Sequence, residues 1–247
     1  MKRLAMLVSL LWLLALTIPA RAAGTPTNPC TGKPFHTVAD GTALRSAEAR
    51  LGGISSNHYV VAFELADNAQ ARAFTDYTRT HIGNALAIVL DGEVLSAPVI
   101  QAELTTGGQI TGNFDLPAAR ELAIELQYGA LPVQLSLTST EKDGRGQRLI
   151  LAAPAGTTEA QLASAVYIIQ RRLLAFDLMH PTVTVTANNQ ITVAILGDRP
   201  DSDAIATRIT RIGRLEFVDF SKPDACTQSM PTHGDHILTD WGESVEF

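Results

Sequence analysis

The chain has 247 residues, of which 46% are hydrophobic and 18% are charged, and its net charge is −6. A chain of this length can bury one large core or two small ones, and two domains are the more usual arrangement. Its Pro, Gly and charge content are not those of a disordered protein. The acidic balance repels phosphate backbones, and the sequence has no basic patch interleaved with aromatic residues, which argues against nucleic acid as a partner.

Residues 1–22 have the pattern of a secretory signal peptide. Lys2 and Arg3 precede a largely apolar run from Leu4 to Ile18, and small residues stand at Ala20 and Ala22, so we expect cleavage after Ala22. The alternative is a retained membrane anchor, but this run is shorter than the roughly 20 residues that a spanning helix needs. No later run approaches that length, so the mature chain is expected to be soluble and exported, to the periplasm or beyond the cell.

Cys30 and Cys226 are the only cysteines and lie near the two ends of the mature chain. In an oxidising compartment two thiols of a small protein usually pair. A bridge between them would be worth about 4 to 5 kcal/mol at most in the chain-entropy model. Two independent thiols are the alternative, and we favour the bridge.

The first predicted elements are weak. Residues 23–34 are rich in Thr, Pro, Gly and Asn and are typical of an extended arm. A domain is expected to begin at residue 35, with a weak strand pattern at 36–38. A short helix, polar and rich in Ala, is predicted next and ends at 51–53.

A strand and a helix follow. Tyr59–Leu65 alternates well enough to be a strand. Asp67 is placed to cap a helix that runs to about Ile82, and Gly83 is placed to end it. The helix would bury one face, which carries Ala71, Phe74 and Thr78.

The next stretch predicts a β-hairpin. Leu86–Leu90 is apolar throughout, so its strand is expected to be buried on both faces, and Val94–Ala97 returns after the Asp91-Gly92 turn. Pro98 removes a hydrogen-bond donor from the sheet, so the return strand should bend away there.

The first domain is predicted to end at residue 137. It continues with a short strand at 107–112, a helix capped by Asp115 and stopped by Gly129, and a last strand at 131–137. The helix face carries Ala119, Leu122, Ala123 and Leu126. The resulting order β-α-β-β-β-α-β predicts a mixed α+β domain over 35–137.

Residues 138–147 are polar, contain Gly and show no periodicity, so they are predicted to be a linker. A strand is expected at Arg148–Ala153, and Thr158 with Gln161 matches a capping box at the start of a long helix. The apolar face of that helix carries Leu162, Val166, Ile169, Leu173 and Phe176.

The second domain, 148–220, is predicted to be ferredoxin-like. Val183–Thr186 and Ile191–Leu196 are expected to be strands joined at Asn188-Asn189. Asp201 would cap a second helix, with Ile205, Ile209 and Ile212 on one face, and Leu215–Phe220 would be the last strand. The order β-α-β-β-α-β is the split βαβ arrangement, and the fold class is α+β.

Residues 221–247 form a loop-like tail that either wraps back through Cys226 or stays mobile. Trp241, Val245 and Phe247 are too apolar for a purely solvated tail. His233, Asp235 and His236 cluster there, but a metal site would need a fourth ligand and rigid support, so no metal is expected.

No catalytic constellation is expected, and no cofactor. Turn, cap and exposed positions account for the carboxylates of the central stretch, Asp91, Glu93, Glu103 and Asp115. No Ser lies in a nucleophile-elbow motif, and the glycines at 107–112 lack the spacing of a phosphate-binding loop. Arg171 and Arg172 are interpreted as a solvated face of the long helix.

The stretch from Asn84 to Leu135 resembles the head part of the first extracytoplasmic domain of the SecD protein-export subunit. The shared order is strand, Asp-Gly turn, strand, Ser-Ala-Pro, Gly-rich link, Gly-Asn-Phe, helix and Gly-Ala-Leu-Pro. Residues 171–195, RRLLAFDLMHPTVTVTANNQITVAI, are similar to the base part of the same domain, and Gly213–Phe217 resembles the family's terminal strand.

The chain departs from this family in its order. In the family the base precedes the head and both lie between membrane helices, whereas here the head-like half comes first and spanning helices are not predicted. The family's coupling to the proton gradient resides in those helices. The resemblance therefore implies binding, not pumping.

We expect a non-catalytic, SecD-like protein that binds unfolded or translocating polypeptide or docks on the protein-export machinery. Strand edges near Pro98 to Gly108 would accept an extended chain by β-augmentation, and the Gly-rich links would let a groove adapt to it. The candidate binding residues are Pro98, Val99, Ile100, Glu103, Gly107 and Gly108. The alternatives are another interaction in the cell envelope, or a small-ligand or metal-binding module centred on the tail. The sequence leaves the oligomeric state open.

Overall fold

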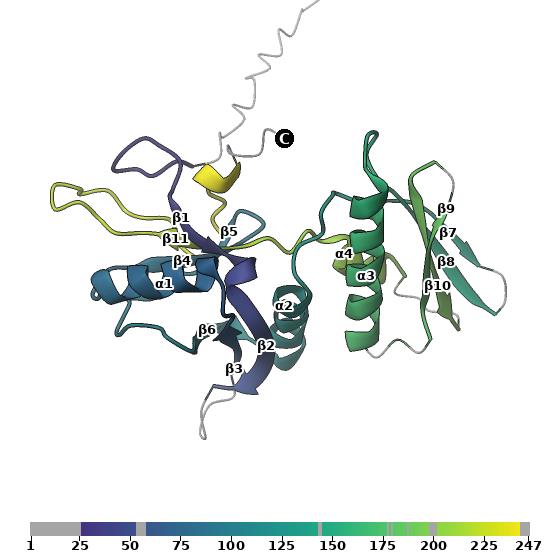
Figure 1. The fold of residues 1–247 in the computed structure, drawn as a ribbon, viewed down its shortest axis with the longest axis horizontal. Helices are drawn as coiled ribbons and strands as arrows, with labels where there is room; N and C mark the ends of the chain where they lie inside the picture. Colours follow the sequence, from purple (N-terminus) through teal and green to yellow (C-terminus); the bar gives the residue numbers. More distant parts are fainter. Residues whose placement is uncertain are drawn as a thin grey trace, which may run out of the picture.

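The computed structural model describes residues 26–52, 58–142, 145–176, 178, 180–186, 188–197 and 202–242 (Figure 1). The predicted signal peptide, the predicted cap Asp201, and Val245 and Phe247 of the tail lie outside this part of the chain. Within it, no helix has the length and hydropathy needed to cross a membrane.

The predicted α+β class is confirmed, since the described residues form four α-helices and three antiparallel sheets. The strands are β1 (Thr37–Asp40), β2 (Leu44–Leu51), β3 (Tyr59–Leu65), β4 (Leu86–Leu90), β5 (Glu93–Ser96), β6 (Gly107–Phe114), β7 (Ser136–Lys142), β8 (Gly146–Ala152), β9 (Thr182–Thr186), β10 (Gln190–Leu196) and β11 (Leu215–Asp219). The helices are α1 (Ala69–Thr80), α2 (Leu116–Tyr128), α3 (Glu159–Ala175) and α4 (Ser202–Thr210), with short 3₁₀ turns η1 (Gly41–Ala43) and η2 (Asp240–Gly242).

The first sheet has the strand order β1-β11-β4-β5 and is built on the predicted hairpin. All five residues of β4 are buried, as its apolar sequence predicts. Asp91 and Gly92 have φ values of 52° and 83°, which is the left-handed backbone that a type I′ turn requires. Helix α1 begins one residue later than predicted, because Asn68 and not Asp67 accepts the capping hydrogen bond from the N–H of Ala71.

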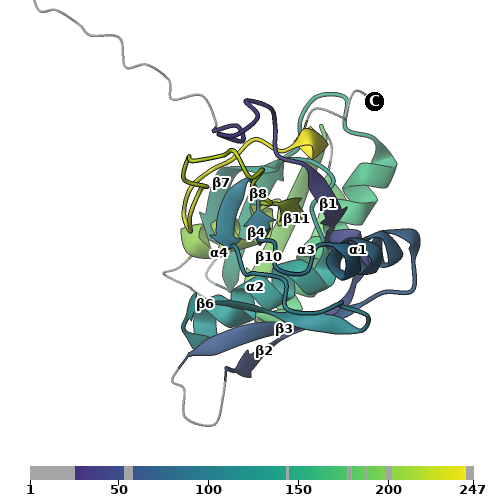
Figure 2. The same cartoon turned by 90° about the vertical axis from the view of Figure 1, so that its left-hand side faces the viewer.

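The second sheet has the order β2-β3-β6 and lies against α2 (Figure 2). The predicted Ala-rich helix before residue 51 is wrong, because Leu44–Leu51 forms strand β2. Ala47 is buried between Arg45 and Glu48, which are exposed, and β2 pairs with β3 along most of its length. Tertiary pairing therefore overrides the helical propensity of these residues.

The segment 131–147 also differs from the prediction. Residues 131–135 are not a strand, although Leu131 and Leu135 are buried, and the predicted linker 138–147 is largely the hairpin of β7 and β8. The strand was missed because β7 is almost wholly polar, Ser-Leu-Thr-Ser-Thr-Glu-Lys, and lies at a sheet edge with most side chains exposed.

The third sheet, β7-β8-β10-β9, has α3 and α4 on one face (Figure 1). The predicted capping box of Thr158 and Gln161 and the predicted β9–β10 hairpin are both present. The ferredoxin-like prediction is wrong in its last strand. Residues 215–219 do not join this sheet, and β7 takes the edge position beside β8 instead.

Strand β11 lies in the first sheet, between β1 and β4. Phe217 explains this position, because its ring lies 4.5 Å from that of Phe74 and 5.7 Å from that of Phe63. The chain thus builds part of one core, forms a separate core with residues 131–212, and returns to the first. We call these the first and second units.

The tail wraps back onto the first unit. Cys30 and Cys226 form the predicted disulfide. The N–H of Val94 donates to the carbonyl of Asp235, and the N–H of Gly234 donates to that of Val94, so the tail covers the outer edge of β5. Ile237 is buried in the core cluster that includes Phe35 and Phe220.

Arg172 joins the two units. It lies on α3 and is fully buried, which contradicts the predicted solvated face, although its neighbour Arg171 is exposed. Its guanidinium donates to the carbonyls of Ile209, Arg211 and Ile212 at the end of α4, and at 2.9 Å to that of Gly129, which caps α2. A cation here satisfies orphan carbonyls and opposes the negative ends of two helix dipoles.

We expect Arg172→Met to lower the free energy of unfolding by about 3 to 5 kcal/mol, because it leaves these carbonyls buried without a donor. Urea denaturation of the full chain measures the change. The matched control is Arg171→Met, one residue earlier and exposed, which should change stability by less than about 1 kcal/mol. Equal effects of the two substitutions would contradict the role given to Arg172.

Candidate functional site

The predicted binding residues lie on the segment that runs from the end of β5 to the start of β6. Pro98 and Glu103 are exposed, and Val99 keeps 47% of its surface exposed. Ile100 is different, since it is buried in the core of the first unit. The structure therefore leaves part of the predicted set accessible and assigns Ile100 to packing.

This segment is tied to the protein along its length. The N–H of Leu86 donates to the carbonyl of Pro98, and Ile100 exchanges hydrogen bonds with the backbone at Gly83 and Asn84. Further on, the N–H of Leu104 donates to the hydroxyl of Thr78 at 3.0 Å. The segment that connects β5 to β6 is therefore fixed against α1 by hydrogen bonds. It is not the flexible link that its sequence predicts.

Close packing accounts for the two glycines. A Cβ on Gly107 would collide with the carbonyl oxygen of Phe63, and one on Gly108 would lie 2.9 Å from the ring of the same Phe63. Gly107 and Gly108 pair with Glu64 and Phe63 on β3. These glycines allow β6 to approach β3, so their presence needs no functional explanation.

Strand β6 is an edge strand. Among the described residues it pairs with β3 on one side and with no strand on the other. Its sequence, Gly-Gly-Gln-Ile-Thr-Gly-Asn-Phe, carries no charge, whereas the opposite edge, β2, carries Arg45, Glu48 and Arg50. Charged side chains discourage pairing with a further strand. The edge that can accept one is therefore β6.

The regular part of this edge is short. Val61 pairs with Ile110, but Tyr59 pairs with Phe114, so extra residues of β6 bulge between these pairs. Residues 107–110 form the straight section that an added strand would meet. Beside its start lies a pocket of about 370 Å³, whose lining includes buried Leu65 and Ala71 and exposed Arg72 and Thr106.

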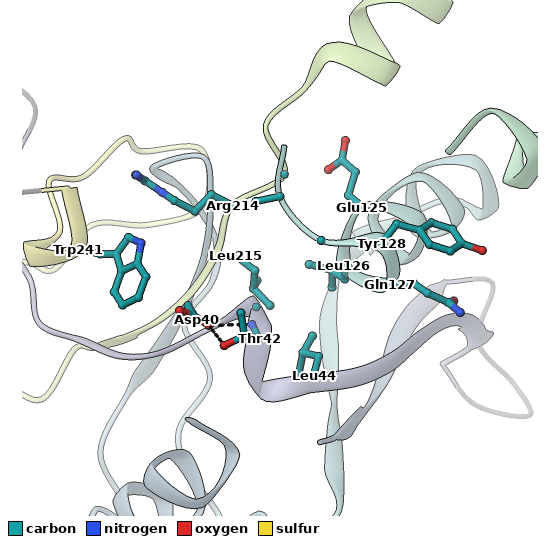
Figure 3. A pocket seen from close by; sticks show the side chains of 14 residues that line it. Asp40, Thr42, Leu44, Glu125, Leu126, Gln127, Tyr128, Arg214, Leu215 and Trp241 are labelled. Atoms are coloured by element: carbon teal, nitrogen blue, oxygen red, sulfur yellow. Dashed lines mark hydrogen bonds between the residues drawn. The ribbon is translucent and has the colours of Figure 1, made fainter. Parts of the chain in front are cut away.

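A second pocket, of about 400 Å³, lies in the first unit, beside the points at which the chain passes to and from the second unit (Figure 3). Its walls are mainly apolar and include Leu44, Leu126, Leu215 and Trp241. Asp40 also lines it, but its carboxylate already accepts hydrogen bonds from the N–H and hydroxyl of Thr42. The pocket is therefore better suited to contact with an apolar side chain than to acid–base chemistry.

Glu125 is the unusual group at this pocket. Its side chain is 1% exposed, and its carboxylate points away from the space beside Trp241, as Figure 3 shows. Among the described residues, neither carboxylate oxygen has a hydrogen-bond partner, and the guanidinium of Arg211 lies 3.6 Å away. Burial raises the pKa of Glu125 to about 7, although Arg211 and Arg172 act in the opposite direction.

The sequence interpretation missed both buried charges of the junction. Arg172 lies three residues after Ile169, and Glu125 lies three residues after Leu122, so each falls on the apolar face of its helix. A charge at such a position is the signal that was available. On sequence alone Arg172 is placed on a solvated face and Glu125 is not singled out, since charged residues are seldom fully buried unless paired.

The carboxylates of the central stretch have structural roles where contacts define them. Asp115 accepts from the N–H of Ala118 and caps α2, as predicted. Asp91 does more than form a turn, because it accepts from the N–H groups of Gly213 and Arg214 at 3.1 and 2.8 Å. Asp91 thereby fixes the path by which the chain returns to β11.

The tail histidines take part in covering β5. The ring Nδ1 of His233 donates a hydrogen bond of 3.0 Å to the carbonyl of Leu95. The backbone of His236 forms an isolated antiparallel β-bridge with that of Glu93. Across the described part of the chain, no three His, Cys, Asp or Glu side chains are grouped as metal ligands. The alternative of a metal-binding tail therefore gains no support from the geometry.

The comparison with protein families points to the first unit. Residues 22–133 match the family described as SecDF, P1 head subdomain. The protein translocase subunit SecD of Acetobacter pasteurianus is 41% identical to the chain over 122 residues, which are 47% of this chain and 23% of that protein. The resemblance to the SecD head is confirmed.

Two further relatives agree. The SecD subunit of Aquifex aeolicus is 38% identical over 138 residues, covering 55% of this chain and 26% of that protein. That of Rhodobacter capsulatus is 55% identical over 67 residues, covering 27% and 12%. The chain thus spans about a quarter or less of the length of these SecD proteins. The family match ends at residue 133, before the predicted base-like half, and no solved structure is a significant match.

The raised pKa of Glu125 gives a prediction with a definite sign. The folded protein holds this proton up to about pH 7, against an ordinary value of 4.5, so Glu125 makes folding less favourable as the pH rises through this window. Glu125→Gln should remove that loss and stabilise the protein near neutral pH by up to about 3 kcal/mol, with little change at low pH.

Urea unfolding across this pH range measures the effect. Glu121→Gln, one turn earlier on α2 and paired at 3.4 Å with Arg208, is the matched control and should keep the loss of stability with rising pH, because burial is the largest cause of the raised pKa of Glu125. If Glu125→Gln followed the wild-type pH dependence as well, the account of Glu125 as a carboxyl whose pKa is raised by burial would be wrong.

Proposed function

We propose that this protein is an exported, SecD-like component of protein translocation that binds unfolded polypeptide and has no catalytic role. The similarity of its first unit to the SecD head supports a place in protein transport. The signal-peptide pattern and the Cys30–Cys226 disulfide are those of a protein that folds outside the cytoplasm.

The open edge of β6 is the observation that carries the binding proposal. An extended chain that pairs with residues 107–110 would continue the sheet β2-β3-β6 through main-chain hydrogen bonds, which are independent of its sequence. Such independence is what a protein that meets many unfolded substrates requires. Exposed Val99 on the adjoining segment adds apolar contact.

The pocket beside the start of β6 completes the site. Leu65 and Ala71 are apolar lining residues, while Asp67 and Arg72, which also line it, pair with each other at 2.9 Å. A bound strand directs alternate side chains to one face of the sheet, so one of them would enter this pocket. The proposed binding residues are thus Pro98, Val99, Glu103 and the edge from Gly107, and Ile100 only supports them.

The partner is a polypeptide, alone or presented by the export machinery. A general role in the cell envelope is the competing proposal, and the two differ in whether the protein distinguishes unfolded from folded chains. Hydrogen bonding along β6 is open only to extended backbone, which a folded protein does not generally offer.

Site-specific photo-crosslinking tests the proposal. A photoreactive residue at Gln109, exposed on β6, should crosslink to a reduced and alkylated protein that stays unfolded, and not to the same protein in its folded form. The matched control is Arg50, exposed on the charged edge β2 of the same sheet. We expect at least a severalfold higher yield at Gln109.

Two outcomes would reject the site. Equal yields at Gln109 and Arg50 would mean that contact with the unfolded chain is not specific to β6. If neither position crosslinks, the binding proposal as a whole is rejected. Far-UV circular dichroism of each variant is the control that the substituted proteins are folded.

A further inference from the structure

The second unit also has an unprotected edge. Strand β9, Thr-Val-Thr-Val-Thr at 182–186, pairs with β10 in unbroken register and, among the described residues, has no strand on its outer side. Residues 181–190 contain no charged side chain. Edge strands that remain single are usually interrupted by charge or by a bulge. The opposite edge, β7, has both, with Glu141 and Lys142 and an irregular register.

Exposed apolar side chains lie beside this edge. Helix α3 packs over β9, and its Tyr167 and Leu174 are each 54% exposed. Together with Pro181, which precedes β9, they line a shallow pocket of about 340 Å³. Val185 pairs with buried Ile191 and so faces the helix side of the sheet, yet it is 49% exposed. A partner placed along β9 would cover all of these groups.

The sequence of β9 selects the kind of partner, because Thr-Val-Thr-Val-Thr reads the same in both directions. When two such strands pair antiparallel about a two-fold axis at Thr184, each Thr meets a Thr and each Val meets a Val. Val183 lies opposite the partner's Val185, and Thr182 lies opposite the partner's Thr186. Like pairs of this kind are favourable across an antiparallel ladder.

We propose that β9 is a self-association surface, on which a second copy of this chain binds antiparallel about a two-fold axis through Thr184. The two sheets then form one continuous sheet, and each Val185 is covered by the partner's Val183. Because a pair of five-residue strands is too small for a stable interface by itself, the α3 stripes of Tyr167 and Leu174 supply further apolar contact.

Self-association is measured by sedimentation of the full chain over a wide concentration range. We expect a reversible monomer–dimer equilibrium for the wild type. Thr184→Lys places two like charges opposite each other on the axis and should weaken dimerisation at least tenfold. Ser139→Lys, which adds the same charge to exposed β7 at the other edge of the sheet, is the matched control and should dimerise like the wild type.

The register gives a second, independent test. Thr184→Cys should form an intermolecular disulfide under mild oxidation, since directly opposite residues have suitable Cα distances. Thr182→Cys alone should not, because the two copies of residue 182 are offset by about 13 Å along the strands. A mixture of Thr182→Cys and Thr186→Cys should crosslink again.

Each contrary result rejects the proposal. A wild-type protein that stays monomeric at every concentration has no such surface, and a Thr184→Lys protein that still dimerises uses another one. If the wild type is monomeric and an unfolded polypeptide crosslinks at position 184, β9 binds a client instead of a second copy. None of these results bears on the test of β6, which lies in the first unit.

Discussion

The burial of one guanidinium, that of Arg172, is the constraint on which the arrangement of the two units depends. It donates to the carbonyl oxygens of Gly129, Ile209 and Ile212, together with that of Arg211. Burial lowers the pKa of Arg172, while Glu125 and Asp91 oppose that shift. The ends of α2 and α4 are thereby fixed on the same side chain, and the chain leaves this point to re-enter the first sheet as β11.

Sequence patterns correctly predicted the elements that depend mainly on interactions between residues close in the sequence. The β4–β5 hairpin follows from an apolar run and an Asp-Gly turn, and α2 and α3 follow from their caps and periodic faces. The errors arose where distant contacts decide. Residues 44–51 look helical but pair with β3, and β7 is polar because it is an edge. The position of β11 depends on the packing of Phe217, which the spacing of elements does not encode.

The proposed site was only partly predictable for the same reason. The sequence indicated the segment around Pro98 to Gly108, but it assigned Ile100 to binding and the glycines to flexibility. Burial of Ile100 and the contact of Gly108 with Phe63 give both a packing role. The feature left for binding is the exposed backbone of the edge strand. The tail covers the edge of β5, whereas β6 and β9 each pair on one side only among the described residues. The two proposals assign an unfolded polypeptide to β6 and a second copy of the chain to β9.

Native-state hydrogen exchange on the wild-type protein tests the central claim most directly. The amide of Leu131 donates to the carbonyl of Ile212 where the chain enters and leaves the second unit, and those of Gly213 and Arg214 donate to Asp91 in the first unit. If Arg172 makes the two units one cooperative structure, these amides should open with the same free energy as the buried amides of β4. If the junction amides exchanged with a much smaller free energy of opening than the amides of β4, the units would move independently. That result would contradict the account.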